Sequence, residues 1–112
     1  MDVVLMIDIP RCRSIIIGEG VSRAALSRED LCVAGYIEYK GRIFSIAIYE
    51  YSDIGVFAAK ISLDLYSDMC SDILYDPHGL IAYAKELDSL CKAIVRKIKR
   101  YLEIYSAGKD PD

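Results

Sequence analysis

The chain of 112 residues contains no Asn, Gln, Thr or Trp, and only one His. Asn and Gln are heat-labile residues that hyperthermophilic proteins reduce, so their complete absence predicts a hyperthermophilic source. Ile, by contrast, occurs sixteen times, and hydrophobic residues make up 54% of the chain against 28% charged residues. This balance excludes a disordered or fibrous class and predicts a single folded domain over residues 1–112.

The sequence also lacks any hydrophobic run that approaches the roughly 20 residues of a membrane-spanning helix. Its first ten residues have neither the basic flank nor the small-residue cleavage site of a signal peptide. We therefore expect a cytoplasmic protein that has no membrane partner.

The four cysteines form no C-x-x-C pair and lie 20, 38 and 21 residues apart: Cys12, Cys32, Cys70 and Cys91. Structural zinc sites need ligands in close local pairs, so we expect no metal site. Intracellular disulfides occur in hyperthermophiles, which leaves one bridge open as an alternative. The prediction is buried or half-buried free thiols.

The middle of the chain predicts a meander of three strands at residues 31–66. In the stretch "YKGRI", Gly41 supplies the positive φ of a two-residue hairpin loop. The turn "SDIG" then returns the chain as a third strand from about Val56. The loop fixes the hairpin register, with these pairs opposite each other: Tyr39 and Arg42, Ile37 and Phe44, Gly35 and Ile46, Val33 and Ile48.

Alternation along these strands sorts the side chains onto two faces of the sheet. One face is apolar and is the predicted core: Val33, Ile37, Phe44, Ile46, Ile48, Phe57, Ala59, Ile61, Leu63 and Leu65. The other face is mixed: Ala34, Tyr36, Glu38, Ser45, Ala47, Tyr49, Tyr51, Ala58, Lys60, Ser62, Asp64 and Tyr66.

The N-terminal third has a weaker pattern. We interpret "VVLMIDI" (residues 3–9) and "SIII" (residues 14–17) as two strands that "PRCR" connects. In "VSRAALSRED", Ser22 and Ser27 are cap residues, and Asp30 stands three residues after the second. This stretch predicts a short helix or turn.

The C-terminal third predicts one long helix, with Asp76 as its cap and Pro77 at its first position. Apolar residues then recur at gaps of four and three: Leu80, Ala84, Leu87, Cys91, Ile94, Ile98, Tyr101 and Tyr105. Residues 106–112 are expected to form a short frayed tail. The predicted fold class is therefore α+β, an antiparallel sheet of about four or five strands with one long C-terminal amphipathic helix packed on one face.

The length of this helix predicts self-association. About 28 helical residues extend for roughly 42 Å, whereas a nine-residue strand spans about 30 Å. The final turns should overhang the sheet and expose apolar residues that a second chain would cover. Our first hypothesis is a homodimer or a subunit of a larger complex, with these contact residues: Tyr101, Leu102, Ile104, Tyr105, Tyr36 and Tyr49.

The basic residues of the helix support an alternative function. Residues 77–112 carry seven basic and five acidic side chains, whereas residues 1–76 carry seven and twelve, within a net charge of −3. A basic helix can bind single-stranded DNA or RNA, with these candidate contacts: Lys92, Arg96, Lys97, Lys99 and Arg100. The same cations also fit the solvent side of an ordinary amphipathic helix. On the predicted fold, the stacking tyrosines lie on the opposite side of the sheet from these cations.

The signals for catalysis are isolated. His78 is the only candidate general acid or base with a pKa near neutrality, and no nucleophile accompanies it. Gly18 and Gly20 in "GEG" lack the remaining residues of a phosphate loop, which favours a turn. Asp68, Asp72 and Asp76 would share one helix face and could hold a divalent ion. A solvated acidic edge explains them as well, so we expect neither an enzyme nor a cofactor.

Overall fold

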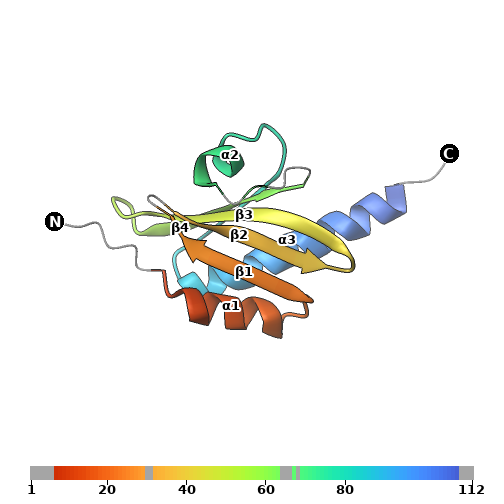
Figure 1. Cartoon of the computed structure of the whole chain (residues 1–112), viewed down its shortest axis with the longest axis horizontal. Coiled ribbons are helices and arrows are strands. Elements are labelled where there is room, and N and C mark those ends of the chain that lie inside the picture. Colours follow the sequence, from red (N-terminus) through yellow and green to blue (C-terminus); the bar gives the residue numbers. More distant parts are fainter. Residues whose placement is uncertain (1–6, 30–31, 64–66, 68, 109–112) are drawn as a thin grey trace.

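The computed structural model describes residues 7–29, 32–63, 67 and 69–108, with side chains up to Tyr105 (Figure 1). Its elements follow one another along the chain as α1 (Ile9–Gly18), β1 (Arg23–Arg28), β2 (Val33–Tyr39), β3 (Arg42–Tyr51), β4 (Val56–Ser62), α2 (Cys70–Leu74), β5 (Leu80–Ala84) and α3 (Leu87–Gly108).

The five strands form one antiparallel sheet in the order β1-β2-β3-β4-β5. The predicted α+β class and the meander are confirmed. The four predicted pairs between β2 and β3 are present, and β4 begins at Val56 as expected. The hairpin loop has positive φ at both Lys40 (52°) and Gly41 (79°), which matches the right-handed twist of the flanking strands.

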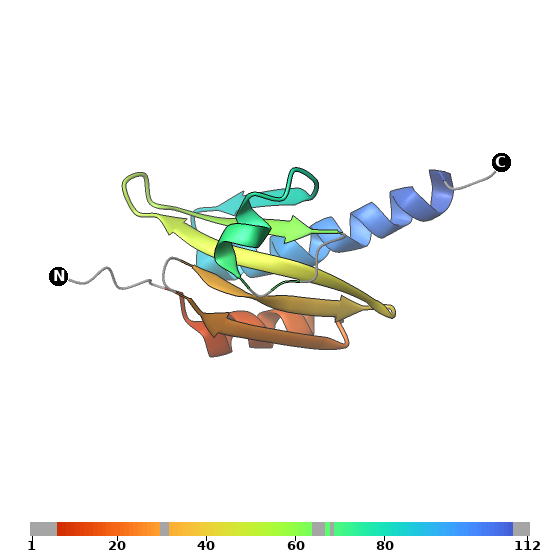
Figure 2. The same cartoon turned by 45° about the horizontal axis from the view of Figure 1, so that its top comes forward.

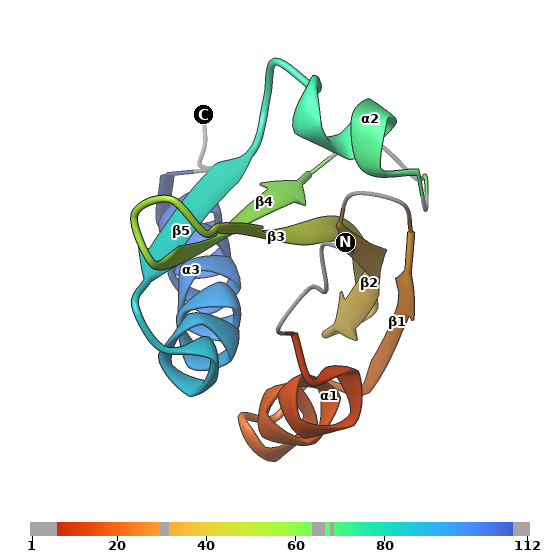
Figure 3. The same cartoon turned by 90° about the vertical axis from the view of Figure 1, so that its left-hand side faces the viewer.

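The sheet curves around two helices, α1 and α3, which lie together on its concave face (Figure 3). Alternate side chains of the strands meet these helices in the main core, whose largest buried members are Phe44, Ile16, Ile37, Ile46, Ile48, Ile61, Leu90, Ile94 and Ile98. The predicted apolar face is thus the core: Phe57 and Leu63 are half-buried and pack against it, and Leu65 lies outside the described residues.

The convex face is partly covered by the short helix α2 (Figures 1 and 3). A small second cluster is buried there: Cys32, Ala34, Ala47 and Ile73. Lys60 is also almost buried, and its ammonium donates hydrogen bonds to the backbone carbonyls of Leu74 and Asp76. The prediction of one covered face was therefore incomplete, because α2 and the turn after it cover part of the mixed face.

The N-terminal prediction of a strand at residues 14–17 was wrong, because these residues belong to α1. The Asp8 carboxylate accepts a hydrogen bond from the Arg11 backbone N–H, and Pro10 lies in the first turn, so local capping favours a helix. Cys12 and Ile16 are four residues apart and both are buried. Most of the strand predicted at residues 3–9 falls on residues 1–6, outside the described residues, and Ile9 begins the helix.

The helix or turn predicted in the stretch from Val21 to Asp30 was also wrong. Arg23–Arg28 forms β1 and pairs with β2 along its whole length. The two strands approach closely at Gly35, where an added Cβ would lie 1.8 Å from the Ala25 carbonyl oxygen. Because only glycine permits this approach, β1 depends on a residue in another strand rather than on its own caps.

The long helix predicted from Asp76 is divided into β5 and α3. Gly79 has φ +143°, and a Cβ there would lie 2.4 Å from the Ile61 carbonyl oxygen, so glycine lets the chain turn close beside β4. Leu80 and Ala84 fit a helical spacing, but they also fit strand alternation, which is what the chain adopts. The helix α3 has 22 residues, or about 33 Å, and it extends to Gly108, beyond the predicted start of the tail.

The four cysteines form two disulfides, which corrects the prediction of free thiols. Cys12–Cys91 joins α1 to α3, and Cys32–Cys70 joins the segment before β2 to α2. Their Cα atoms are 5.6 Å and 6.1 Å apart. Sequence separations of 79 and 38 residues gave no sign of these contacts, since the fold alone brings the partners together.

Candidate functional site

The C-terminal end of α3 projects past the turn between β2 and β3 (Figures 1 and 2). Tyr101 and Leu102 are half-buried there, whereas Ile104 is 59% and Tyr105 52% exposed. The predicted overhang therefore exists, although it arises from the position of a shorter helix rather than from excess length.

The other two residues predicted for self-association lie elsewhere. Tyr36 and Tyr49 are half-buried on the convex face, and Tyr49 packs against the small cluster under α2. Burial raises the pKa of the Tyr49 hydroxyl, and its interaction with the neighbouring Tyr51 raises it further. Its ring makes an edge contact with Tyr51 at 5.2 Å between centroids. The six residues therefore belong to two separate surfaces.

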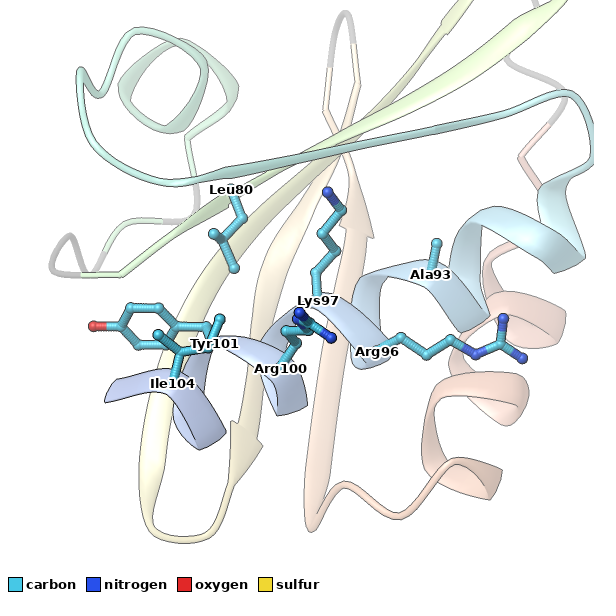
Figure 4. A pocket seen from close by; sticks show the side chains of 7 residues that line it. All are labelled: Leu80, Ala93, Arg96, Lys97, Arg100, Tyr101 and Ile104. Carbon is cyan, nitrogen blue, oxygen red and sulfur yellow. The ribbon is translucent and has the colours of Figure 1, made fainter. Parts of the chain in front are cut away.

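A groove of about 490 Å³ runs along one flank of the projecting helix (Figure 4). Its apolar lining comes from Leu80 at the start of β5 and from Ala93, Tyr101 and Ile104 of α3. Its charged lining comes from three predicted nucleic-acid contacts: Arg96, Lys97 and Arg100. In Figure 4 the Leu80 side chain points from β5 toward Tyr101, while the three cations project from α3. Apolar and basic side chains thus line the same groove.

A second recess of about 500 Å³ lies on the other flank, between α3 and the tip of the β2–β3 hairpin. It is lined by Tyr39, Lys40, Arg42, Lys99, Leu102, Glu103 and Tyr105. The rings of Tyr101 and Tyr105 stack with centroids 5.8 Å apart, and the Arg42 guanidinium lies 5.8 Å and 5.7 Å from them. Such cation–π contacts hold the hairpin tip against the helix.

Lys99 has a structural role in addition to its charge. Its ammonium donates a 2.6 Å hydrogen bond to the Glu19 carbonyl and lies 5.9 Å from the centre of the Tyr39 ring. It therefore ties α3 to the end of α1. Lys92 is exposed and lines a different recess beside Arg11 and Asp88, one helical turn before Arg96.

Both flanks of the α3 end are therefore basic. We define the basic end as Lys40, Arg42, Arg96, Lys97, Lys99 and Arg100, which line the two recesses; among the described residues that line them, Glu103 is the one acidic side chain. The predicted separation holds for Tyr36, Tyr49 and Tyr51, which lie on the convex face, while Tyr66 lies outside the described residues. The prediction was incomplete, because it left out Tyr39, Tyr101 and Tyr105, which line the recesses together with the cations.

The candidate catalytic residues do not converge. His78 is exposed, and its backbone N–H donates to Asp76, which lowers the pKa of that carboxyl. Asp76 thus shapes the turn before β5 instead of capping a long helix. Asp72 accepts a hydrogen bond from the Ser67 hydroxyl, and Asp68 lies outside the described residues. Among the residues that the structure describes, no group of three metal-ligating side chains is found.

The glycines of "GEG" have a structural role at the end of α1. The Glu19 N–H donates to carbonyls of the last turn, and Gly20 has φ +106°, a conformation that favours glycine. The stretch is a turn, as predicted.

The sequence analysis did not identify Tyr39, Lys40 and Arg42, which line the second recess together with Lys99 of the helix. The one available signal was their place at the tip of the hairpin.

None of the helices in the described part of the chain is long and apolar enough to cross a membrane. Comparison of the sequence and the structure with family models, curated proteins and solved structures gives no match in any of the three.

Proposed function

We propose that the protein is a non-enzymatic assembly protein that binds another protein through the projecting end of α3. The observation that carries this proposal is the exposure of Ile104 and Tyr105 on a helix end that extends past the sheet. A contact formed by apolar and tyrosine side chains inside a polar rim is typical of protein interfaces.

The charge around these side chains favours a partner with an acidic surface. Two copies that met through the same basic end would bring like charges together, and such contacts cost several kcal/mol. Homodimerisation remains a prediction, and sedimentation at micromolar concentration tests it. An acidic patch on a different protein would instead complement Arg96, Lys97 and Arg100, which line one groove with Ile104.

A site-specific cross-linking experiment tests the proposal in the native host. A photoreactive residue replaces Ile104, and the control replaces Ile54, which is 69% exposed in the turn between β3 and β4. We expect position 104, but not position 54, to capture a partner protein, and Arg96→Glu with Arg100→Glu to abolish the capture. Equal amounts of cross-linked protein at both positions, or no cross-linked protein at position 104, would contradict the proposal.

A second candidate function is the binding of single-stranded nucleic acid. It is supported by the placement of tyrosines next to the cations in both recesses, since bases stack on aromatic rings while cations contact phosphates. Tyr105 is half-exposed, and it neighbours Arg42 and Lys99 in the second recess.

Titration of labelled single-stranded oligonucleotides tests this candidate. Binding through three to four phosphates should weaken by roughly tenfold or more between about 50 and about 200 mM salt. Arg96→Ala with Arg100→Ala should abolish it, whereas Lys92→Ala is the matched control because Lys92 is an exposed cation of the same helix outside the basic end. Failure to bind at low salt would eliminate the candidate.

A further inference from the structure

The two edges of the sheet differ in how they are protected. At the β1 edge, Arg23 and Arg28 stand at the strand ends, and the Ala24 carbonyl already accepts a 2.8 Å hydrogen bond from Arg13. Charged side chains and occupied carbonyls discourage the addition of another strand. The sequence of β5, "LIAYA", contains no charge and no proline, and within the described part of the chain β5 pairs only with β4. The β5 edge is therefore open to strand pairing.

The side chains on the two faces of β5 meet different surroundings. Leu80, Ala82 and Ala84 face α3 and belong to the core or pack against it. Ile81 and Tyr83 point to the convex face and are 44% and 60% exposed. A strand added beside β5 would thus have two different faces. One face would lie beside Ile81 and Tyr83, and the other would lie beside the groove of α3.

That groove provides positive charge on the concave side of the β5 edge. Arg96, Lys97 and Arg100 line it together with Leu80. In an added strand, successive side chains would point alternately toward these cations and toward the face of Ile81 and Tyr83. The matching sequence therefore alternates acidic and apolar residues.

We propose that β5 and the α3 groove bind an extended segment of a partner protein, in which acidic and apolar residues alternate, by strand addition. This inference rests on the proposed function, because it names the class of partner for the same surface. Backbone hydrogen bonds to β5 would supply affinity, and the alternating side chains would supply specificity.

A second copy of this chain fits the same edge less well. Its own β5 contains no acidic residue, so pairing of two β5 strands would bring two rows of cations together without a counter-charge. The charges thus select a different protein over a symmetric pairing.

Three synthetic peptides of about eight residues, a usual strand length, test the side-chain pattern. One alternates Glu and Val, one Gln and Val, and one Lys and Val. We expect the Glu peptide to bind, the Gln peptide to bind about tenfold more weakly or worse, and the Lys peptide not to bind. Arg96→Ala with Arg100→Ala should abolish binding of the Glu peptide, while Lys92→Ala, which removes one cation of the same helix outside the groove, should change it less than twofold.

Backbone methylation tests strand addition itself. In an edge strand, alternate N–H groups point toward the neighbouring strand and away from it. Of two Glu peptides that are N-methylated at odd or at even positions, one should lose binding and the other should retain it. Equal binding of both would overturn strand addition, even if the charges matter.

The outcomes also separate this inference from the proposed function. Capture of a protein at position 104 without binding of any Glu peptide would overturn only the strand addition. Binding of oligonucleotides with failure of both the peptide and the protein capture would overturn both proposals and favour the nucleic-acid function.

Discussion

The two faces of the sheet are closed in different ways. On the concave face, α1 and α3 bury a large apolar core that contains Phe44 and several isoleucines. On the convex face, the five-residue helix α2 buries only a small cluster, and a disulfide and the hydrogen bonds of Lys60 hold the segment in place. A small contact area supplies little hydrophobic free energy, so the convex cover depends on covalent and polar links.

Removal of each disulfide should have large and different effects. In the chain-entropy treatment, the loops of 79 and 38 residues correspond to about 4.5 and about 3.9 kcal/mol of unfolding free energy. We expect Cys12→Ser with Cys91→Ser to lower the stability of the whole domain. The second double variant, Cys32→Ser with Cys70→Ser, should also lower the stability, and it should increase hydrogen exchange around α2. Urea titration and exchange measurements check this, and equal exchange in α2 for the two variants would contradict the contrast.

A matched pair of isoleucines compares the packing of the two faces. Ile61 and Ile73 are both fully buried, the first in the concave core and the second under α2. We expect Ile61→Ala to cost about 4 kcal/mol and Ile73→Ala about 2 kcal/mol, because a short surface helix can shift to fill the space. Urea unfolding of both variants measures the difference, and a larger loss for Ile73→Ala would be the contrary result.

Substitution of Lys60 tests the polar link on the convex face. Lys60→Met keeps the aliphatic stem but leaves the carbonyls of Leu74 and Asp76 without their donor, which should cost about 1–3 kcal/mol. Lys85→Met, at an exposed position beyond β5, is the control and should be close to neutral. A stability equal to that of the parent protein for Lys60→Met would show that this link is dispensable.

The smallest expected effect concerns the ion pair that joins α1 and α3 at the surface. Arg11 donates hydrogen bonds of 2.8 Å and 2.6 Å to the Asp88 carboxylate, which lowers the pKa of Asp88. A lowered pKa in the folded state means that the stabilisation is present above about pH 4 and is lost as the pH falls through the lowered value. The urea midpoint of unfolding should fall less on acidification in Asp88→Asn than in the parent chain. The same pH dependence of the midpoint in both proteins would contradict this.

The sequence predicted the elements whose signals are local. The hairpin loop at Lys40 and Gly41 fixes the register of β2 and β3 through its own turn geometry, so the pairs were correct. The stripe of α3 from Leu87 onward was also visible, because it continues over several turns. Both features depend on residues close to each other in the chain.

The elements that were missed depend on distant residues. β1 needs Gly35 of the next strand, and β5 needs the close approach of Gly79 to Ile61. The disulfide partners and the meeting of Arg42 with Tyr101 and Tyr105 likewise join segments that only the fold brings together. In the candidate site, the helix residues were therefore predicted, whereas the hairpin residues and the β5 edge were not.

The two disulfide loops are nested, since Cys32–Cys70 lies within the span of Cys12–Cys91. The exposed turn at residues 52–55 falls inside both loops. A protease that cut the chain at this turn would leave two fragments joined by two covalent bonds, and the fragments would separate only in the presence of a reductant. The oxidised chain would thus remain a single molecule after a backbone break at this exposed turn.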